Sequence, residues 1–560
     1  MQRPISEPKI PRDPPRHDGY AEGWSRTVVS QGVAVWLSVL FSAGLLAVPL
    51  ADGLLGAWRD PASKAEEGIA RIVRCFTSQG FRWPAVVEAN SAALGAIKNF
   101  ESSLEDSSAL AASVRPQSLD GLLRIGGAGS EEAYIGRDGW LFYRPDVDAL
   151  VMRTASSDQV ARGIADFAAQ LAARGIRLVL VPVPGKASIH PEKLAPEGTT
   201  FRVPPVPPVL SGLAPKIAAA WREMKIFDSS LAPQVFDTTT LLWRRKTEGN
   251  GDQFLHTDSH WAPGAMRAAA EAVSHVLSGV PLGAREELTP HPRQVSAIGD
   301  TALMLNIPAS SPLSALQTVA IESVAGAGGE QWRADRACPV LVLGDSYTNI
   351  FSSEDLGWGS ASGFAEQLSR SLGCRVDKLA RNDAGAKSAR EMLAAETARN
   401  PGWLDGKKVV VWVMAAREFV RGDWSDVKLP GVVSSSAQRE FFVVPPGADR
   451  EVTAEVVSLG KVPAAADSPY ADYLTALLLA NLEDAATGAK ISGETLAYIF
   501  SMRDHKIVPL PGLAEGRRVK LRLSSYADKA DKLDSLNRGD LEDFEVMMEE
   551  PNFAEWIAPH

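Results

Sequence analysis

The run Leu341-Val342-Leu343-Gly344-Asp345-Ser346-Tyr347-Thr348 places a short apolar segment directly before a tight turn and a serine. A sheet presents a nucleophile at its carboxyl edge in this way, on a turn between a buried strand and a helix. A second run, Val409-Val410-Val411-Trp412-Val413, is typical of a parallel strand that is buried on both faces. Helical and strand patterns alternate from residue 136 to residue 420, so the sequence predicts an α/β domain with a mostly parallel sheet.

A base for this serine stands upstream in the chain. Asp258-Ser259-His260 carries an Asp-x-His pair, so one loop can supply both a general base and the carboxylate that orients it. We therefore predict Ser346 as nucleophile, His260 as base and Asp258 as orienting group. His256 is the nearest rival for the base. In the structural alternative, Ser346 and Asp258 only cap the helices that follow them.

Four short motifs occur in a fixed order along about half of the chain. They are Gly136-Arg137-Asp138-Gly139-Trp140-Leu141-Phe142-Tyr143, then Val181-Pro182-Val183-Pro184-Gly185-Lys186 with His190-Pro191-Glu192, then Asp258-Ser259-His260-Trp261, and Gly344-Asp345-Ser346-Tyr347. In this order they resemble the periplasmic alginate O-acetyltransferase family of the AlgJ and AlgX type. The resemblance implies an SGNH-hydrolase-like fold and assigns Asp258, His260 and Ser346 to an acetyl-transfer triad.

The turn at the serine departs from the resembled family in one position. Many members read Gly-Thr-Ser there, whereas this chain has Gly344-Asp345-Ser346, as simple esterases do. A periplasmic carbohydrate esterase with the same triad therefore stays open as an alternative function. A non-catalytic scaffold of a polysaccharide export complex is the alternative outside the enzymes.

Five further residues are candidates for contact with the oxyanion or the substrate. Asn382 and Gly385 follow the next predicted strand, where SGNH-like enzymes place oxyanion groups. Lys186 and Arg417 stand at the ends of apolar strands, where open α/β sheets bind ligands. Tyr347 directly follows the nucleophile. Surface ion pairs are the alternative role for the two charged residues.

Charge and residue spacing exclude several function classes. The formal net charge of -10 argues against nucleic acid as a partner, because binding to its backbone needs clustered Lys and Arg. Cysteines and histidines do not cluster at metal-ligand spacing, and no Gly-rich phosphate loop follows a strand, so no metal and no cofactor is predicted. Cys338 and Cys374 precede two predicted neighbouring strands, where the sequence allows a disulfide or two buried thiols.

The amino terminus predicts a membrane anchor. Residues 27–51 contain no charged residue and are long enough to span a bilayer, and the arginines of residues 1–26 favour a cytoplasmic tail. We expect a single-pass inner-membrane protein with its catalytic part in the periplasm; a cleaved signal peptide is the rival interpretation. Residues 52–125 are expected to form a helical spacer, residues 126–425 the SGNH-like domain, and residues 440–560 a small β domain, barrel or sandwich, for which polysaccharide binding is one interpretation.

The expected function is transfer of acetyl groups to hydroxyls of an exopolysaccharide through an acetyl-serine. An enzyme outside the cytoplasm cannot draw on cytosolic acetyl-CoA directly. In the resembled systems a multispanning membrane O-acyltransferase passes acetyl groups across the membrane. The resemblance therefore implies such a donor partner here, beside a polysaccharide acceptor.

Overall fold

The structure is a computed structural model that describes residues 109–126, 129–151, 157–194, 208–226, 228–430, 439–463 and 470–557. Contacts between Cα atoms divide the chain into two units, Met1–Ser118 and Leu119–His560. The predicted cytoplasmic tail and anchor, and most of the predicted spacer, lie outside the described residues. Within the ranges that are described, no helix has both the length and the apolar character needed to cross a bilayer.

Five parallel strands form the central sheet, as the alternation of helix and strand predicted. All residues of β7 (Val340–Gly344) and β9 (Val409–Ala415) are buried, which explains why both runs are apolar at consecutive positions. Because neighbouring strands run in the same direction, their carboxyl ends lie along one edge. The order across the sheet is β4 (Gln234–Val235), β3 (Arg177–Val183), β9, β7 and β8 (Asp377–Ala380).

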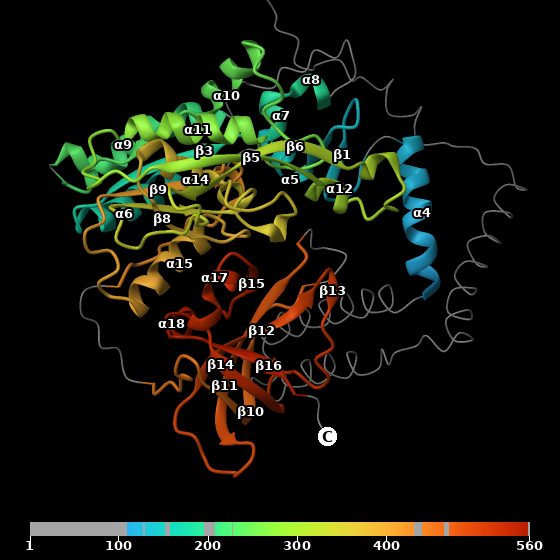
Figure 1. Cartoon of the computed structure of the whole chain (residues 1–560), viewed down its shortest axis with the longest axis vertical. Helices are drawn as coiled ribbons and strands as arrows, with labels where there is room; N and C mark the ends of the chain where they lie inside the picture. Colours follow the sequence, from blue (N-terminus) through green and yellow to red (C-terminus); the bar gives the residue numbers. More distant parts are fainter. Residues whose placement is uncertain are drawn as a thin grey trace, which may run out of the picture. The chain divides into compact units, whose positions relative to one another are not determined.

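Helices cover both faces of this sheet (Figure 1). Successive strand residues point to opposite faces, so Val342 and Leu343 enter different cores. Val342 packs in a core with α11 (Pro263–Val276) and α14 (Phe364–Leu372). Leu343 packs in a core with three other helices, α6 (Ser157–Ala172), α9 (Pro208–Glu223) and α15 (Ala386–Arg399). This three-layer arrangement fixes the carboxyl edge of the sheet as the place for a site.

Several smaller elements lie outside the central sheet, among them a short strand pair. β1 (Ala133–Ile135) pairs with β2 (Leu141–Tyr143), and a turn with positive φ at Asp138 (56°) and Gly139 (78°) leads into β2. Trp140 in this motif is 2% exposed. The aromatic motif, Trp140-Leu141-Phe142-Tyr143, is therefore part of the packing. Further elements of the described residues are α4 (Ala109–Gly126), α5 (Arg144–Val151), α10 (Thr238–Thr247), α12 (Asp300–Leu303), and the antiparallel pair β5 (Leu288–Ala297) and β6 (Gln317–Gly326).

The carboxyl-terminal β domain is a closed barrel, which decides between the two predicted forms. Pairing runs from β10 to β11, β12, β16, β14 and back to β10. Its interior is filled by apolar residues that alternate along the strands, such as Val452, Ala454 and Val456 of β10. The barrel strands are β10 (Asp449–Leu459), β11 (Tyr473–Asp484), β12 (Thr495–Arg503), β14 (Arg518–Ser525) and β16 (Asn552–Trp556), with β13 (Lys506–Ile507) and β15 (Asn537–Gly539) added at the sides.

Polar contacts join the loop after β8 to the barrel. Arg381 donates to Asp540 at 2.7 Å, and the backbone N–H of Asn382 donates to the carbonyl of Ser535 at 3.3 Å. Arg381 also donates to Asp383 at 2.7 Å, so this buried guanidinium is held by two carboxylates. Both parts belong to the unit Leu119–His560. The barrel therefore lies against the edge of the sheet that carries the predicted site.

The two described cysteines are close neighbours. Cys338 and Cys374 are buried free thiols whose Sγ atoms are 3.6 Å apart. Each precedes a strand of the neighbouring pair β7 and β8, as the sequence predicted. Burial and the hydrogen bond between them suit two packed thiols in this structure.

Candidate active site

Ser346 stands at the turn between β7 and the short helix α13 (Ser346–Asn349). Gly344 ends the strand. A Cβ atom at this position would collide with the side chain of Thr348, so the tight turn requires glycine. The serine is thereby placed at the carboxyl edge of the sheet, next to the ends of β8 and β9.

Asp345, the second residue of the Gly-Asp-Ser turn, has two structural contacts. Its Oδ1 accepts the backbone N–H of Tyr347 at 2.9 Å and so caps α13. Its Oδ2 accepts the backbone N–H of Ala415 at 2.9 Å, at the end of β9. Burial raises the pKa of Asp345 to about 6. Asp345 therefore fixes the turn to the neighbouring strand.

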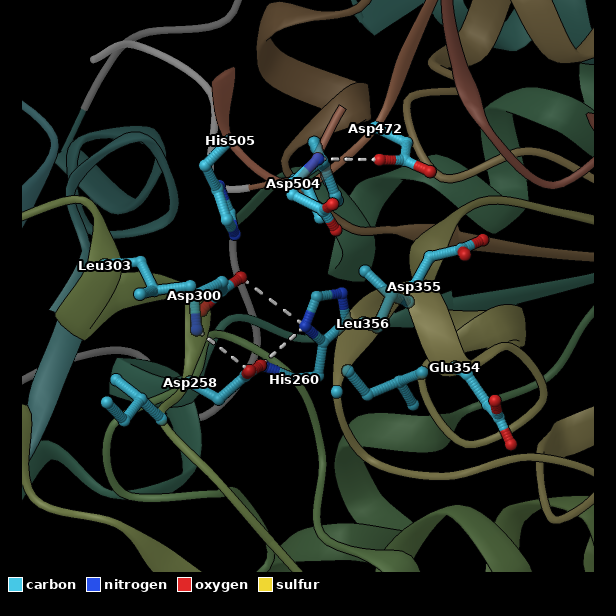
Figure 2. A pocket seen from close by; sticks show the side chains of 15 residues that line it. Asp258, His260, Asp300, Leu303, Glu354, Asp355, Leu356, Asp472, Asp504 and His505 are labelled. Atoms are coloured by element: carbon cyan, nitrogen blue, oxygen red, sulfur yellow. Dashed lines mark hydrogen bonds and ion pairs between the residues drawn. The ribbon is translucent and has the colours of Figure 1, made fainter. Parts of the chain in front are cut away.

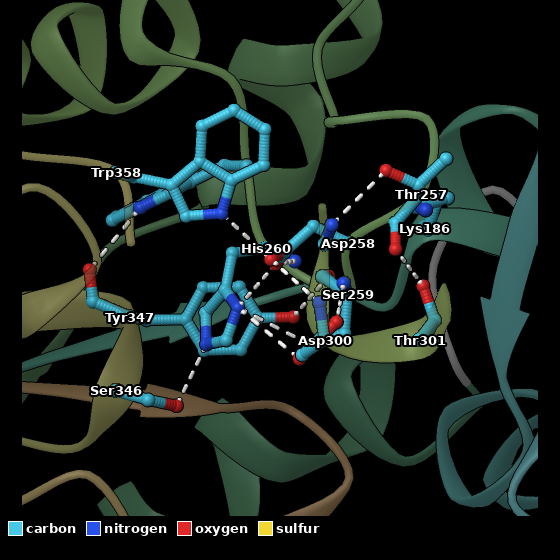
Figure 3. Close-up of polar contacts among 12 residues, drawn as sticks. Lys186, Thr257, Asp258, Ser259, His260, Asp300, Thr301, Ser346, Tyr347 and Trp358 are labelled. Atoms are coloured by element: carbon cyan, nitrogen blue, oxygen red, sulfur yellow. Dashed lines mark hydrogen bonds and ion pairs between the residues drawn. The ribbon is translucent and has the colours of Figure 1, made fainter. Parts of the chain in front are cut away.

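Ser346, His260 and Asp258 form one hydrogen-bonded chain (Figure 3). Ser346 Oγ lies 2.7 Å from His260 Nε2, and His260 Nδ1 lies 2.7 Å from Asp258 Oδ1. The exposed fractions of the three residues are 3%, 2% and 1%. With a neutral imidazole, Nδ1–H donates to the carboxylate and Nε2 accepts from the hydroxyl. The structure thus brings together the three residues that the sequence predicted.

Four donors converge on the carboxylate of Asp258. Oδ1 accepts the side-chain and backbone N–H of His260, at 2.7 and 3.0 Å. Oδ2 accepts the backbone N–H of Asp300 at 3.0 Å and the indole N–H of Trp358 at 2.8 Å. Burial alone would raise the pKa of Asp258, but the charge and hydrogen bonds of His260 and the N–H of Asp300 lower it to about 2. Asp258 is therefore held ionised and in one orientation.

Asp300 is a second carboxylate beside the base. Its Oδ2 lies 3.5 Å from His260 Nδ1, and its Oδ1 accepts the backbone N–H of Ser259 at 2.6 Å. Burial and the charge of Asp258 raise the pKa of Asp300 to about 6. Burial alone would lower the pKa of His260, but the carboxylates, Asp258 first, raise it above its ordinary value. The site therefore stabilises an imidazolium, which is the charged form that arises when Ser346 loses its proton.

Two of the further candidates, Lys186 and Arg417, have their charges engaged within the fold. Lys186 is 2% exposed, and its ammonium donates to the carbonyls of Leu141 at 2.6 Å and His256 at 3.0 Å. Burial lowers the pKa of Lys186 to about 8. Arg417 donates to Asp146 at 3.0 Å, a carboxylate that is buried. Both side chains support the polypeptide around the site, and neither lines the cavity described below.

Tyr347 and His256 also have structural contacts. The Tyr347 hydroxyl donates to the carbonyl of Ser259 at 3.1 Å, and its own carbonyl accepts the indole N–H of Trp261 at 3.1 Å. Tyr347 therefore fixes the loop that carries the base. His256 Nε2 lies 2.7 Å from Asp252, and its ring stacks on Trp140 at 4.5 Å. It is partly exposed and is not bonded to Ser346, so the geometry favours His260 as the base.

Of the two oxyanion candidates, Asn382 has an unused donor. Its Oδ1 accepts from Asn349 at 3.0 Å, while its buried Nδ2 has no hydrogen-bond partner. Asn349 ends α13, the helix that begins with Ser346. Gly385 is instead the N-cap of α15, where its N–H donates to Ser388 at 3.0 Å. Of the two candidates, Asn382 is therefore the one whose side chain keeps a free donor beside α13.

Sequence reasoning missed two residues that hold the base and its carboxylate. Asp300 is 42 residues after Asp258, and Trp358 is 100 residues after it, so no local spacing indicates either contact. A signal for Trp358 does exist. Gly357 and Gly359 flank it with φ of 77° and 89°, which marks a backbone that must turn sharply around one large side chain.

A cavity of about 360 Å³ opens beside His260 (Figure 2). Its lining includes Asp258 and Asp300 from the sheet domain and Asp504 and His505 from the barrel. Among the described residues, the donor atoms of Asp258, His260 and Asp300 lie within 4.8 Å of one another, close enough to share a metal ion. Both oxygens of Asp258 already accept hydrogen bonds, so the cluster serves the orientation of His260.

Two known proteins that are similar to this chain carry the same name. The chain is 26% identical over 234 residues to "Probable alginate O-acetylase AlgJ" of Pseudomonas putida, which covers 38% of this chain and 54% of that protein. It is 24% identical over 262 residues to the protein of the same name from Pseudomonas fluorescens, covering 45% and 60%. The chain thus spans little more than half the length of these relatives.

Solved structures of AlgJ and AlgX proteins also align with the chain. The O-acetyltransferase domain of Pseudomonas putida AlgJ aligns at 22% identity and a TM-score of 0.38, over 52% of this chain and 92% of that domain. Pseudomonas aeruginosa AlgX aligns at 16% identity and a TM-score of 0.40, over 70% and 91%. The family model "SGNH hydrolase-like domain, acetyltransferase AlgX" matches residues 133–416, just over half of the chain. On this match, the chain belongs to the AlgX family of SGNH hydrolase-like domains.

Proposed function

We propose that this protein is a polysaccharide O-acetyltransferase that carries the acetyl group on Ser346. The observation that supports this most is the buried chain from Ser346 Oγ through His260 to Asp258, with both contacts at 2.7 Å. Family membership supports acetyl transfer as the reaction. The name alginate belongs to the relatives, and the acceptor of this chain is argued separately below.

The first half-reaction forms the acetyl-serine. Ser346 Oγ attacks the carbonyl carbon of the acetyl donor while its proton passes to His260 Nε2. The resulting imidazolium is stabilised by Asp258 and by Asp300, whose carboxylate is 3.5 Å from Nδ1. His260 then gives the proton to the leaving group, and the tetrahedral intermediate collapses to the ester on Ser346.

The second half-reaction transfers the acetyl group. A sugar hydroxyl gives its proton to His260 Nε2 and attacks the carbonyl carbon of the ester. Collapse of the intermediate releases Ser346 Oγ, which takes the proton back from His260. Asp258 keeps the neutral imidazole of His260 in one tautomer, with the proton on Nδ1, because four donors fix the two carboxylate oxygens of Asp258.

The negative oxygen of both intermediates requires donors. The backbone N–H of Ser346 and the unpaired Nδ2 of Asn382 are the proposed pair. Each such donor contributes on the order of 3 kcal/mol to transition-state stabilisation. Asn349 orients the Asn382 amide by its bond at 3.0 Å, so that Nδ2 remains the unused group.

The reaction is proposed to occur in the periplasm, with the chain anchored in the inner membrane. Support comes from the uncharged residues 27–51 and the arginines before them. A membrane-bound O-acyltransferase is the proposed acetyl donor. Recovery of the full-length chain in the inner-membrane fraction is expected, and a soluble protein beginning near Asp52 would contradict the anchor.

A carbohydrate esterase is the second candidate function, since the same acetyl-serine can be resolved by water. The Gly-Asp-Ser turn does not favour it, because Asp345 is explained by its bonds to Tyr347 and Ala415. The full-length protein in detergent, given a chromogenic acetyl ester and oligosaccharides, should yield acetylated sugar by mass spectrometry. Acetate as the sole product with every extracellular polymer of the source organism would replace transfer by hydrolysis.

A further inference from the structure

The cavity beside His260 differs from an anion-binding site in its charge. We propose, resting on the transferase function above, that this cavity is the acceptor subsite and that it takes a glycan without negative charge, a neutral or amine-bearing sugar rather than a uronate. The barrel supplies one wall of the subsite, so the β domain takes part in choosing the acceptor.

The cavity has two walls from distant parts of the chain. Asp258, His260 and Asp300 line it from the sheet domain, and Asp472 and Asp504 line it from the barrel. Figure 2 shows Asp504 across the cavity from Asp258 and Asp300. Ser346 does not line the cavity itself; its Oγ is 2.7 Å from Nε2 of His260, and the His260 side chain is part of the lining. A volume of about 360 Å³ is of the size that binds small ligands.

The barrel wall is a fixed hairpin tip. β12 and β13 are joined by Asp504 and His505, and Arg503 pairs with Lys506. Both tip residues have positive φ, 49° and 58°, as a two-residue hairpin turn requires, and contacts with the neighbouring segment hold them. Those contacts are the bond from His505 N–H to the carbonyl of Ala471 at 2.9 Å and from Asp504 N–H to Asp472 Oδ1 at 3.0 Å.

Acidic side chains predominate on the lining of the cavity. Six carboxyl groups line the cavity, and among the described residues no lysine or arginine does. Asp258 is offset by His260, and burial raises the pKa of both Asp300 and Asp355. The carboxyl groups are Asp258, Asp300, Glu354, Asp355, Asp472 and Asp504. A uronate carboxylate would have to enter among these groups with the imidazoles of His260 and His505, and no lysine or arginine, to balance it.

Hydroxyl and ammonium groups fit the same lining. Carboxylate oxygens accept hydrogen bonds from sugar hydroxyls, and a protonated amine adds an attractive charge. Apolar side chains complete the wall, among them Ile298, Leu303 and Leu356, and can pack against the C–H face of a sugar ring. The cavity therefore offers acceptors and apolar surface, which is the complement of an uncharged or amino sugar.

The test compares three oligosaccharides of equal length as acceptors for the full-length protein: a β-glucan, a chitosan and a polymannuronate. 4-Nitrophenyl acetate is the acetyl donor, and acetylated sugar is measured by mass spectrometry. We expect acetylation of the glucan and the chitosan, with kcat/KM for the mannuronate lower by about tenfold or more because of like-charge repulsion. Equal or better acetylation of the mannuronate would overturn the proposal.

Two variants test whether the charges on the barrel wall cause the discrimination against mannuronate. Asp472→Asn with Asp504→Asn removes two charges from the barrel wall, and asparagine tolerates the positive φ at 504. This double variant should lose most of the discrimination against mannuronate. Asp449→Asn with Asp531→Asn, at side chains that are 67% and 89% exposed and lie outside the lining, also removes two charges; this control should keep the discrimination. Unchanged discrimination in the double variant would contradict the subsite.

Acetyl-Ser346 measured without acceptor separates the two proposals. If no acetyl-serine forms, the proposed function fails. If it forms and the mannuronate is preferred, only the acceptor inference fails. Acetate as the sole product with all three oligosaccharides also overturns the inference, since the cavity then serves no such acceptor.

Discussion

Asp258 is the residue on which the electrostatics of the site depend. Four N–H donors hold its carboxylate, and burial in the absence of those donors would favour the protonated form. The fixed negative charge of Asp258, 2.7 Å from Nδ1 of His260, orients the imidazole and stabilises its protonated form. The hydroxyl of Ser346 lies 2.7 Å from Nε2, so the three residues of the proposed triad are aligned in the absence of a substrate.

Removal of a triad member should abolish turnover of a small acetyl ester. Ser346→Ala and His260→Ala should each lower kcat by on the order of 10⁶-fold, and their losses should not add, because they act as one unit. Asp258→Asn should lower kcat by about 10⁴-fold, since the imidazole loses its orienting carboxylate. Ser371→Ala, at an exposed serine of α14, is the matched control. An active Ser346→Ala variant, with circular dichroism unchanged, would sink the assignment.

Replacement of Asp300 should shift the pH profile. Ester turnover requires neutral His260, so kcat/KM rises with pH through the pKa of His260, which lies above its ordinary value. Asp300→Asn removes one of the charges that raise this pKa, so the rising limb should move to lower pH. The amide can still accept the N–H of Ser259, so the loop keeps its contact. An unshifted limb, with kcat otherwise intact, would show that Asp300 has no influence on the base.

A site residue could be predicted from the sequence when its contacts are with residues close to it in the chain. Asp258 and His260 are two positions apart, so their spacing in the sequence already carries the contact. Lys186 and Arg417 have the right place in the sheet, but buried carbonyls and Asp146 engage their charges. Asp300 reaches His260 only through the tertiary fold, and a single sequence has no pattern that records such a contact.

At the scale of elements, the segments around Ser346 and His260 are held by buried polar contacts as well as by apolar strands. Lys186 begins the short helix α7 (Lys186–Ile189), and its ammonium joins two carbonyls that precede the site, those of Leu141 and His256. This contact holds the aromatic motif next to the loop of the base. The apolar runs of β7 and β9 were predictable because both faces are buried, whereas the contacts of Lys186 were not.

Lys186→Met should destabilise the protein. The substitution keeps the length of the side chain but leaves two carbonyls without their donor, which costs about 1–3 kcal/mol. Lys428→Met is the matched control, since the Lys428 side chain is 66% exposed and pairs with Asp166 at the surface. Thermal unfolding followed by circular dichroism should show a lower midpoint for the first variant only. Equal midpoints would mean that the buried ammonium contributes no net stability.

At the scale of the whole molecule, the cavity beside His260 is lined by residues of both the sheet domain and the barrel. The sequence predicted a small β domain after the catalytic domain, and the structure makes it a closed barrel. Its strand order was not predictable, because β16, last in the chain, pairs between β12 and β14. For the same reason the sequence did not indicate that Asp504 and His505 line a cavity with His260.

Acetyl transfer should become more efficient with a longer acceptor. In the proposed subsite, contacts with both walls of the cavity would position the hydroxyl at the acyl-serine, which would make the second step effectively unimolecular. kcat/KM for transfer should therefore rise with oligosaccharide length, while acetyl-serine formation without acceptor stays the same. A monosaccharide that is acetylated as efficiently as a long oligosaccharide would contradict a role for the extended cavity.

The covalent intermediate is the most direct test of the proposed chemistry. The full-length protein is mixed with 4-nitrophenyl acetate, quenched in acid, and analysed by intact mass and by mass spectrometry of its peptides. One acetyl group should appear on the peptide that contains Ser346, be absent from the Ser346→Ala variant, and disappear when an acceptor glycan is added. Continued turnover with no acetyl group on Ser346, or with the acetyl group on a different residue, would contradict Ser346 as the carrier.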